Sequence, residues 1–386
     1  MATPLDYLLI SPASPYRGGI TDSTHQLALA LQDQGHQVQI WTFTKLYPEF
    51  LFPGSSQFSS ADPPQNLNIA RRLHAYNPLQ WWTVIQRIKK NPPKQIIFRY
   101  YTPFLAPCYG YIAKRLKSIT SLCLLVDNWR PHESSLLDRQ FIRYLKKNFD
   151  TYVTLSEAVA EELKSDNITN VGIGFHPIAN DLPKPISKAK ARRALGWPEN
   201  QKIALFYGLV RPYKGLDLLL KAMTIAPAAQ QNIHLAIVGE FYEPLERYTT
   251  FIRDHKLKDR TYLFPKFADD HYTQQVFSAA DIIVLPYRSA SQSGVLALAY
   301  HFEKPILATH HPGLAKPIKN DETGWICQPN SKSLSIGLNS CFETEIEDRI
   351  NNIQQAKDQY SWRNFVTWMQ HFLENSHGLI SKNKLK

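Results

Sequence analysis

The fold is decided by the stretch LPYRSASQSGVLALAYHFEKP, residues 285–305. It begins at the end of one apolar run, 282–285, and leads into another, 306–309, and both runs are typical of buried parallel strands. Between them, small and polar residues precede the apolar segment 295–302, which predicts a helix. A turn from strand into helix leaves the first N–H groups of the helix unpaired, and the helix dipole makes that end positive.

This turn is therefore a candidate anion site. Gly294 would let a phosphate group approach the backbone closely, and the hydroxyl groups of Ser291 and Ser293 could donate hydrogen bonds to it. Gln292 and Val295 complete the set of predicted ligand-binding residues here. The same letters also fit a simple N-cap before a buried helix, so the stretch alone leaves both interpretations open.

Length and composition limit the class of protein. The chain has 386 residues, 44% of them hydrophobic, which is enough for two domains with separate cores. Its four cysteines are scattered and form no CxxC pair, which predicts reduced thiols in a cytosolic protein. No segment approaches the ~20 apolar residues of a membrane span, and the first residues lack the features of a secretory signal. We expect a cytoplasmic protein.

The chain is basic, with a formal net charge of +11. Such an excess favours nucleic acid, an anionic membrane or phosphorylated substrates as partners, and we expect no nucleic acid because no zinc-finger or RNP-type motif is present. Residues 77–90, NPLQWWTVIQRIKK, predict an amphipathic helix in which Trp81 and Trp82 lie beside basic residues. The helix could make peripheral contact with the inner face of an anionic membrane, or it could simply pack its tryptophans on a sheet.

Strands and helices alternate along both halves of the chain, which predicts doubly wound parallel sheets. In the first half, the strand 7–11 is followed by a loop and by a helix that Ser23 is expected to cap and Gly35 to end. The segment 175–188, with three prolines, is expected to be the hinge between two domains. The remaining predicted strands are 38–42, 95–98, 121–126, 152–155, 203–207, 234–238, 261–264 and 325–327.

Two places in the first half combine strand ends with chemistry-bearing residues. Gly18 and Gly19 follow the first strand, but the loop is not GxGxxG, so it does not support a dinucleotide-dehydrogenase. The pair marks either a close backbone approach or a plain tight turn. The strand 121–126 runs into a polar cluster, and open α/β sheets bind ligands at such strand ends. That cluster contains Asp127, Asn128, Arg130, His132 and Glu133.

Three segments of the second half together resemble one family. They are FYGLVRPYKGLDLLLKAM (206–223), ADIIVLPYRSASQSGVLALAYHFEKPILAT (280–309) and HPGLAKPIKNDETGWICQP (311–329). They resemble the GT-B glycosyltransferases, and within them the large retaining group called family 4, or glycosyltransferase group 1. SPASPYRGGI and VDNWRPHE look like that family's donor-facing and acceptor-side loops, and YSWRNFVTWMQHF is similar to its terminal helix. The resemblance covers nearly the whole chain.

The resemblance implies two Rossmann-like α/β domains that face each other across a cleft. Residues 1–180 would form the acceptor domain, with the helix 361–376 packing back on it, and residues 181–360 the nucleotide-sugar donor domain. The implied reaction is retaining transfer, of hexosyltransferase type, from a nucleotide diphosphate sugar to a hydroxyl of a glycan, glycolipid or small molecule. The implied partners are that donor and a glycan or lipid-linked acceptor, with no metal and no other cofactor.

The chemistry of the residues agrees with this. Lys214, beside Gly215, could hold a diphosphate as a point charge, and Arg211 could contact the same group with two N–H donors. Together with Asp127 these are the predicted catalytic residues. Further predicted donor-binding residues are Gly18, Gly19, Gly208 and Glu240, and the predicted acceptor-side residues are Arg17, Asn128, His132 and Glu133.

The sequence also departs from the family pattern. Two glutamates of the family are absent, one near Ala290 and one at Leu298, and Glu240 or Glu303 is a candidate replacement. The family's arginine would stand at Leu209, so Arg211 is a shifted substitute. These changes predict that the ribose and the donor sugar are recognised differently here.

Asp127 stands where many relatives carry a histidine that faces the reacting sugar. A carboxylate could accept a proton, orient the donor sugar or stabilise positive charge on it. We favour orientation, with the departing phosphate oxygen taking the proton of the acceptor. Two alternatives share the scaffold: a nucleotide-sugar epimerase, which needs two acid–base groups around one carbon, and a non-catalytic sugar-nucleotide binder.

Overall fold

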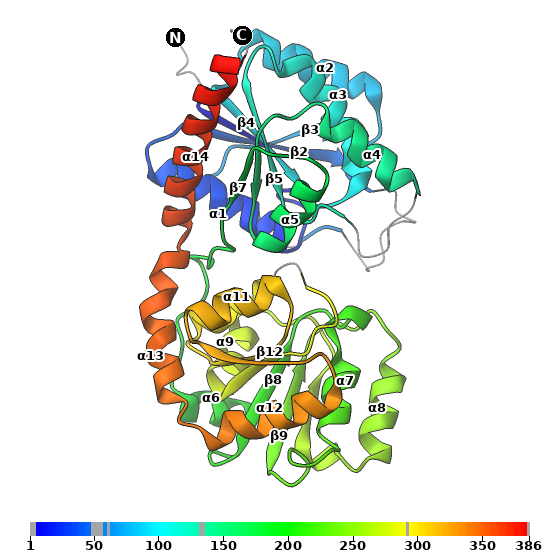
Figure 1. The fold of residues 1–386 in the computed structure, drawn as a ribbon, viewed down its shortest axis with the longest axis vertical. Helices are drawn as coiled ribbons and strands as arrows, with labels where there is room; N and C mark the ends of the chain where they lie inside the picture. The colour runs from blue at the N-terminus through cyan, green and yellow to red at the C-terminus, as the bar shows by residue number, and fades with distance from the viewer. Residues whose placement is uncertain (1–4, 48–56, 60–61, 131–135, 291–292, 384–386) are drawn as a thin grey trace. The chain divides into compact units, whose positions relative to one another are not determined.

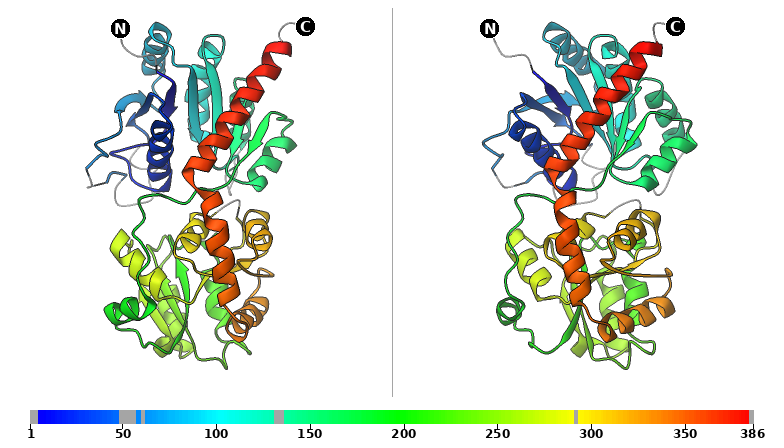
Figure 2. Two further views of the ribbon diagram at one scale, coloured as in Figure 1. Left: turned by 90° about the vertical axis from the view of Figure 1, so that its left-hand side faces the viewer. Right: turned by 60° about the vertical axis from the view of Figure 1, so that its left-hand side comes forward.

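The computed structural model describes residues 5–47, 57–59, 62–130, 136–290 and 293–383. The chain divides into two compact units, which are shown in Figures 1 and 2. Unit 1 comprises Met1–Pro177 and Trp362–Lys386, and unit 2 comprises Ile178–Ser361. The C-terminal helix therefore belongs to the same unit as the N-terminal half of the chain.

Unit 1 is built on a parallel sheet of seven strands in the order β3-β2-β1-β4-β5-β6-β7. The direction of winding reverses between β1 and β4, and ligands of open α/β sheets bind outside the strand ends at such a point. The loop after β1 carries the candidates Arg17, Gly18 and Gly19, whereas Asp127 and Asn128 follow β5, the neighbour of β4 in the sheet. The strands are β1 (Tyr7–Ile10), β2 (Val38–Lys45), β3 (Ile69–His74), β4 (Gln95–Tyr100), β5 (Ser121–Val126), β6 (Tyr152–Thr154) and β7 (Val171–Ile173).

Helices cover both faces of this sheet (Figure 2). Alternate residues of a strand point to opposite faces, so Leu8 and Ile10 pack with the helices of one face and Leu9 with those of the other. One face carries α2 (Pro78–Lys90), α3 (Ala106–Leu116), α4 (Leu136–Lys146) and α5 (Glu157–Ser165), and the other carries α1 (Gly19–Asp33) and α14 (Trp362–Asn383). A short 3₁₀ helix, η2 (Pro103–Leu105), precedes α3.

Unit 2 has a parallel sheet of six strands in the order β10-β9-β8-β11-β12-β13, and its winding reverses between β8 and β11. The strands are β8 (Lys202–Tyr207), β9 (Ile233–Val238), β10 (Thr261–Phe264), β11 (Ile282–Leu285), β12 (Ile306–Thr309) and β13 (Gly324–Cys327). The helices are α6 (Lys188–Leu195), α7 (Leu216–Ala222), α8 (Leu245–Asp254), α9 (Asp270–Ala279), α10 (Gly294–His301), α11 (Pro312–Asn320), α12 (Ser331–Glu343) and α13 (Glu347–Ala356). Three 3₁₀ helices join them: η3 (Pro212–Lys214), η4 (Lys258–Arg260) and η5 (Lys357–Tyr360).

The expected cap of the first helix was wrong. Helix α1 begins at Gly19 rather than after Ser23, and its N-cap is Gly18 with φ 115°. A side chain is strained at this backbone angle, although a Cβ on Gly18 would meet nothing within 4 Å. Gly18 is therefore needed for its backbone conformation at the start of α1, and its contact with a donor stays a prediction.

The tryptophan pair of α2 divides between the core and the surface. Trp81 is buried and its Nε1 donates to the carbonyl of His74 at 2.7 Å, whereas Trp82 is 57% exposed and Leu79 is 80% exposed. Packing on the sheet is thus correct for Trp81, and membrane contact through Trp82 stays a prediction. Among the described residues, no helix is both long enough and apolar enough to cross a bilayer.

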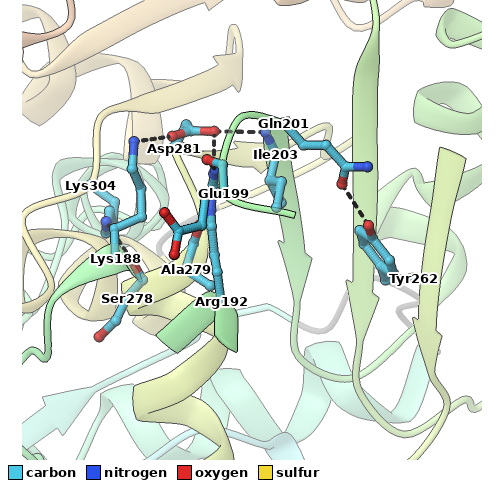
Figure 3. Close-up of polar contacts among 10 residues, drawn as sticks. All are labelled: Lys188, Arg192, Glu199, Gln201, Ile203, Tyr262, Ser278, Ala279, Asp281 and Lys304. Atoms are coloured by element: carbon cyan, nitrogen blue, oxygen red, sulfur yellow. Dashed lines mark hydrogen bonds and ion pairs between the residues drawn. The ribbon is translucent and has the colours of Figure 1, made fainter. Parts of the chain in front are cut away.

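A polar network fixes the start of the strands in unit 2 (Figure 3). The carboxylate of Asp281 accepts from Arg192 at 2.8 Å, from Lys188 at 3.0 Å and from the backbone N–H of Ile203 at 2.7 Å. Nearby, Lys304 Nζ donates to the carbonyl of Ser278 at 3.1 Å. Burial lowers the pKa of Lys304 from 10.5 to about 8, an effect that the charge of Asp281 partly opposes.

This pKa predicts a pH dependence of stability. Between about pH 8 and 10.5 the unfolded chain holds a proton on Lys304 that the folded chain has lost, so the unfolding free energy rises with pH in this window. Lys304→Met should remove that rise, and the stability gain from the variant should be largest below pH 8. Urea titrations from pH 7 to pH 11 test this, with the exposed Lys332→Met as control. Parallel pH profiles for wild type and Lys304→Met would contradict it.

Candidate active site

Three loops of unit 2 meet backbone to backbone at the carboxyl ends of β8, β9 and β11. A Cβ on Gly215 would lie 2.0 Å from the carbonyl oxygen of Pro286, and a Cβ on Gly239 would lie 1.9 Å from that of Gly208. Three glycines in these loops have positive φ: 69° at Gly215, 150° at Gly239 and 100° at Gly208. A side chain at Gly215 or Gly239 would require the backbone to move, and one at Gly208 would collide with the side chain of Lys214, so glycine is what allows the loops to converge.

Lys214 lies in the middle of this convergence. Its side chain is buried. A Cβ placed on Gly208 would lie 2.9 Å from Nζ of Lys214 and 3.6 Å from Cγ2 of Val295, so both side chains contact the Gly208 turn. The structure thus brings Val295, from the segment 280–309, next to Gly208 and Lys214 of the segment 206–223. Burial lowers the pKa of Lys214, with Tyr213 opposing this effect and Arg211 adding to it. Within the described residues no carboxylate pairs with the Lys214 ammonium, so an anion bound here would offset the cost of its burial.

Arg211 approaches the same loops. Its guanidinium lies 4.7 Å from the ring centroid of Tyr242, and its Nε is buried without a hydrogen-bond partner in the described part of the chain. The backbone N–H of Val210 donates to the carbonyl of Glu240 at 2.8 Å, which places Glu240 beside Arg211 in the neighbouring loop. Arg211 therefore retains N–H donors for a ligand.

The start of α10 supplies the second part of the site. Ser293 is its N-cap but makes no side-chain capping bond, and instead its Oγ lies 3.1 Å from the hydroxyl of Tyr287. Both groups are buried, and the ring of Tyr287 lies 5.4 Å from Lys214 Nζ. Gly294 and Val295 open the helix, so the first N–H groups of α10 lie next to these residues. The predicted Ser291 and Gln292 lie outside the described residues.

An ion pair that we did not predict holds the two loops together. The guanidinium of Arg288 donates to both oxygens of Asp217, at 2.7 and 2.6 Å, and also to the carbonyl of Pro212 at 2.8 Å. Burial alone would raise the pKa of Asp217, but the hydrogen bonds and charge of Arg288 lower it overall. Because Pro212 begins η3, this clamp fixes the turn that carries Lys214.

In unit 1, Asp127 is buried in an ion pair with a second residue that we did not predict. Arg99 of β4 donates from Nε to Oδ2 at 2.8 Å and from NH2 to Oδ1 at 2.7 Å, and each residue is 2% exposed. The only sequence signal was a charge inside the apolar strand QIIFRY. Both carboxylate oxygens accept from Arg99, which suits a positioning role for Asp127 better than proton transfer; its catalytic role stays a prediction.

The other predicted residues of unit 1 follow strands β1 and β5. Arg17 is exposed, and its N–H donates to the carbonyl of Gln57 at 3.0 Å. Gly18 and Gly19 begin α1, and the partly exposed Asn128 follows Asp127. The predicted His132 and Glu133 lie outside the described residues.

One candidate for the missing carboxylates is already engaged. Glu303, at the far end of α10, accepts from Lys357 at 2.6 Å and from Gln354 at 2.7 Å. Glu240 has no such partner among the described residues, and its backbone lies beside Arg211, so it stays the stronger candidate for that replacement. Leu298 packs against the apolar core, as does Ala290. In the described part of the chain, no group of three or more His, Cys, Asp or Glu could hold a metal ion.

Comparisons with known proteins cover both units. A family model described as "Glycosyl transferases group 1" matches residues 187–359, and one described as "Glycosyltransferase Family 4" matches residues 17–171. An uncharacterized glycosyltransferase of Methanocaldococcus jannaschii is 26% identical over 229 residues, which are 55% of this chain and 57% of that protein. A GDP-mannose:glycolipid 4-beta-D-mannosyltransferase of Xanthomonas campestris is 30% identical over 123 residues, 32% of this chain and 34% of that protein. The matches thus span about a third to just over half of these relatives.

Solved structures match over nearly the full length. A sucrose-phosphate synthase from Thermosynechococcus elongatus aligns with a TM-score of 0.74 and 18% identity, covering 97% of this chain and 100% of that one. At this identity the likeness concerns the fold alone, which is the GT-B fold with its two Rossmann-like sheets.

Gly208 offers a direct test of the site. In Gly208→Ala, the new Cβ would displace Lys214 Nζ, so we expect affinity for a nucleoside diphosphate to fall about tenfold or more. Gly196→Ala is the matched control, because Gly196 has φ 68° but open space around its Cβ. Both variants should lose stability from backbone strain, of roughly 1 kcal/mol. Isothermal titration calorimetry measures the affinities, and an equal effect of the two substitutions on affinity would contradict the assignment.

Proposed function

Because this chain belongs to the glycosyltransferases of group 1 and family 4, we propose that it transfers a sugar from a nucleotide diphosphate sugar to an acceptor hydroxyl. One observation carries the proposal: the buried ammonium of Lys214 has no carboxylate partner among the described residues and lies beside the start of α10. Arg211, with its unpaired and buried Nε, adds a second cation. A diphosphate has the charge and the acceptor oxygens that this arrangement lacks.

The proposed role of these groups is to stabilise the leaving group. Transfer breaks the bond between the anomeric carbon of the sugar and a phosphate oxygen, so negative charge grows on the diphosphate. Lys214, Arg211 and the N–H groups that begin α10 would neutralise that charge from fixed positions. The clamp between Arg288 and Asp217 supports this role because it limits the movement of the Lys214 turn.

The finer description of the reaction extends this proposal. We assign retention of the anomeric configuration, a hexose as the transferred sugar, and a glycan or lipid-linked acceptor. A glycolipid is the acceptor in the name of the Xanthomonas campestris relative, which supports the last point. Asp127 is assigned a positioning role through Arg99, and the departing phosphate oxygen takes the proton of the acceptor hydroxyl.

The two alternatives make different demands on the site. An epimerase needs two groups that exchange protons with one sugar carbon, and Asp127, with both oxygens held by Arg99, is poorly suited to that. A non-catalytic binder would keep Lys214 and Arg211 without turnover. A panel of labelled nucleotide sugars distinguishes all three: release of nucleoside diphosphate supports transfer, interconversion of the sugars supports epimerisation, and binding without either supports the binder.

Lys214→Ala tests the donor site itself. We expect affinity for nucleoside diphosphates to fall about 10- to 100-fold, because a charge-assisted contact is lost. The free energy of unfolding should stay the same or rise, since a buried ammonium is removed. Lys221→Ala is the matched control, an exposed lysine of α7 in the same unit. Unchanged affinity in Lys214→Ala, measured by calorimetry, would place the diphosphate elsewhere.

Asp127→Asn should lower the stability of the protein without weakening nucleoside diphosphate binding, the reverse of what we expect for Lys214→Ala. It leaves the buried Arg99 without its counter-charge, so the free energy of unfolding should fall by about 3–5 kcal/mol, while affinity for nucleoside diphosphate is kept. The double variant Arg99→Met with Asp127→Leu removes both charges and should recover most of that stability. If this folded double variant also transfers sugar at the wild-type rate, the positioning role is wrong and the pair only stabilises unit 1.

A further inference from the structure

A cavity in unit 1 gathers basic side chains that the proposed reaction does not use. It has a volume of about 430 Å³ and is lined mainly by residues of α4, by Arg130 after β5 and by Asp166 after α5. Its basic residues are Arg130, Arg139, Arg143 and Lys146, and its acidic residues are Asp138 and Asp166. The lining therefore has a net positive charge, and its volume is within the usual range for small-molecule sites.

The floor of the cavity is fixed by Asp166. Its carboxylate accepts from the indole N–H of the buried Trp129 at 2.6 Å and from Arg130 at 2.9 Å, and its carbonyl accepts from Lys146 Nζ at 2.6 Å. The charge of Asp166 is thus already neutralised by its ion pair with Arg130. Arg130, although exposed, also donates to the hydroxyl of Ser165 at 3.3 Å, so two contacts fix the orientation of its guanidinium at the floor of the cavity.

Arg139 and Arg143 remain available above this floor. They are one helical turn apart on α4, so they lie on one face of the helix, and both are exposed. In the described part of the chain neither makes a hydrogen bond or an ion pair. Two guanidinium groups on one face of a helix present paired N–H donors, the arrangement that matches the oxygens of a phosphate.

The surrounding surface would raise the local concentration of such an anion. Of the helices on this face of the sheet, α2, α3 and α4 carry three, two and three basic residues against a single acidic one, Asp138, whereas α5 carries three glutamates and one lysine, so basic residues still exceed acidic ones. Helix α1, on the opposite face, carries Asp22 and Asp33 and no basic residue. The excess positive charge of unit 1 is thus concentrated on the face that contains the cavity.

We propose that this cavity is a second anion site that binds a phosphate group of a phosphorylated ligand through Arg139 and Arg143, with Arg130 and Lys146 behind them. The phosphate could belong to a soluble compound or to a lipid headgroup, and the chemistry of recognition is the same. The site uses none of the residues assigned to the donor, so it does not depend on the transfer reaction.

The experiment compares two double variants in a Lys214→Ala background, which weakens anion binding in unit 2. Arg139→Ala with Arg143→Ala removes the proposed donors, and Lys117→Ala with Lys147→Ala removes the same charge from exposed positions outside the cavity lining. One arm titrates inorganic pyrophosphate by calorimetry. The other measures sedimentation with phosphatidylcholine vesicles that contain phosphatidic acid. Circular dichroism checks that all variants fold.

We expect the arginine variant to bind at least one of the two probes about tenfold more weakly than the background, and the lysine variant to bind like the background. Loss in the pyrophosphate arm assigns a soluble ligand, and loss in the vesicle arm alone assigns a lipid. Equal losses in both double variants would mean general surface charge and would overturn the proposal. Absence of binding to either probe in the background protein would also overturn it. Arg139→Lys with Arg143→Lys should restore little of the affinity if paired N–H donors matter, and full restoration would contradict that geometry.

Discussion

The close approach of backbone atoms in unit 2 is the constraint from which the proposed donor site follows. Gly215 and Gly239 each place a Cα where a Cβ would overlap the carbonyl oxygen of another loop, so three loops share one small volume. That arrangement buries Lys214 against Gly208 and leaves its ammonium away from water. A cation held this way is costly in isolation and therefore strongly favours an anionic partner. The ion pair between Arg288 and Asp217 holds the turn in place, so Lys214 cannot move out to water to avoid the cost of burying its charge.

The two units treat buried charge in opposite ways. In unit 1, Arg99 and Asp127 neutralise each other with two hydrogen bonds, which gives the strand ends a fixed geometry and no net charge. In unit 2, Lys214 and Arg211 have no carboxylate partner among the described residues, and positive charge accumulates. The first arrangement suits a scaffold that orients a neutral substrate, and the second suits a site that binds and stabilises a leaving diphosphate.

The sequence was most informative where one local pattern determines the structure. The strand at 121–126 has the predicted bounds because its apolar run is flanked by polar residues. The edge strand β3 was missed because Arg71 and Arg72 face solvent and break the pattern that a buried strand would have. The pair Asp217 and Arg288 was also missed, since it joins residues 71 positions apart and no local pattern records such a contact.

The two family glutamates that this sequence lacks limit how much of the family's site can be assigned from motif spacing alone. Leu298 takes part in the packing of α10, so a carboxylate cannot simply be supplied again from that helix. Glu240 belongs to a different loop, the one after β9. Its backbone carbonyl accepts from the N–H of Val210, which places Glu240 beside Arg211. A carboxylate in that place would compete with a phosphate for the guanidinium if it turned inward. Arg211 Nε has no hydrogen-bond partner among the described residues, so the Glu240 carboxylate does not occupy it, and we propose that Glu240 instead serves a hydroxyl of the donor.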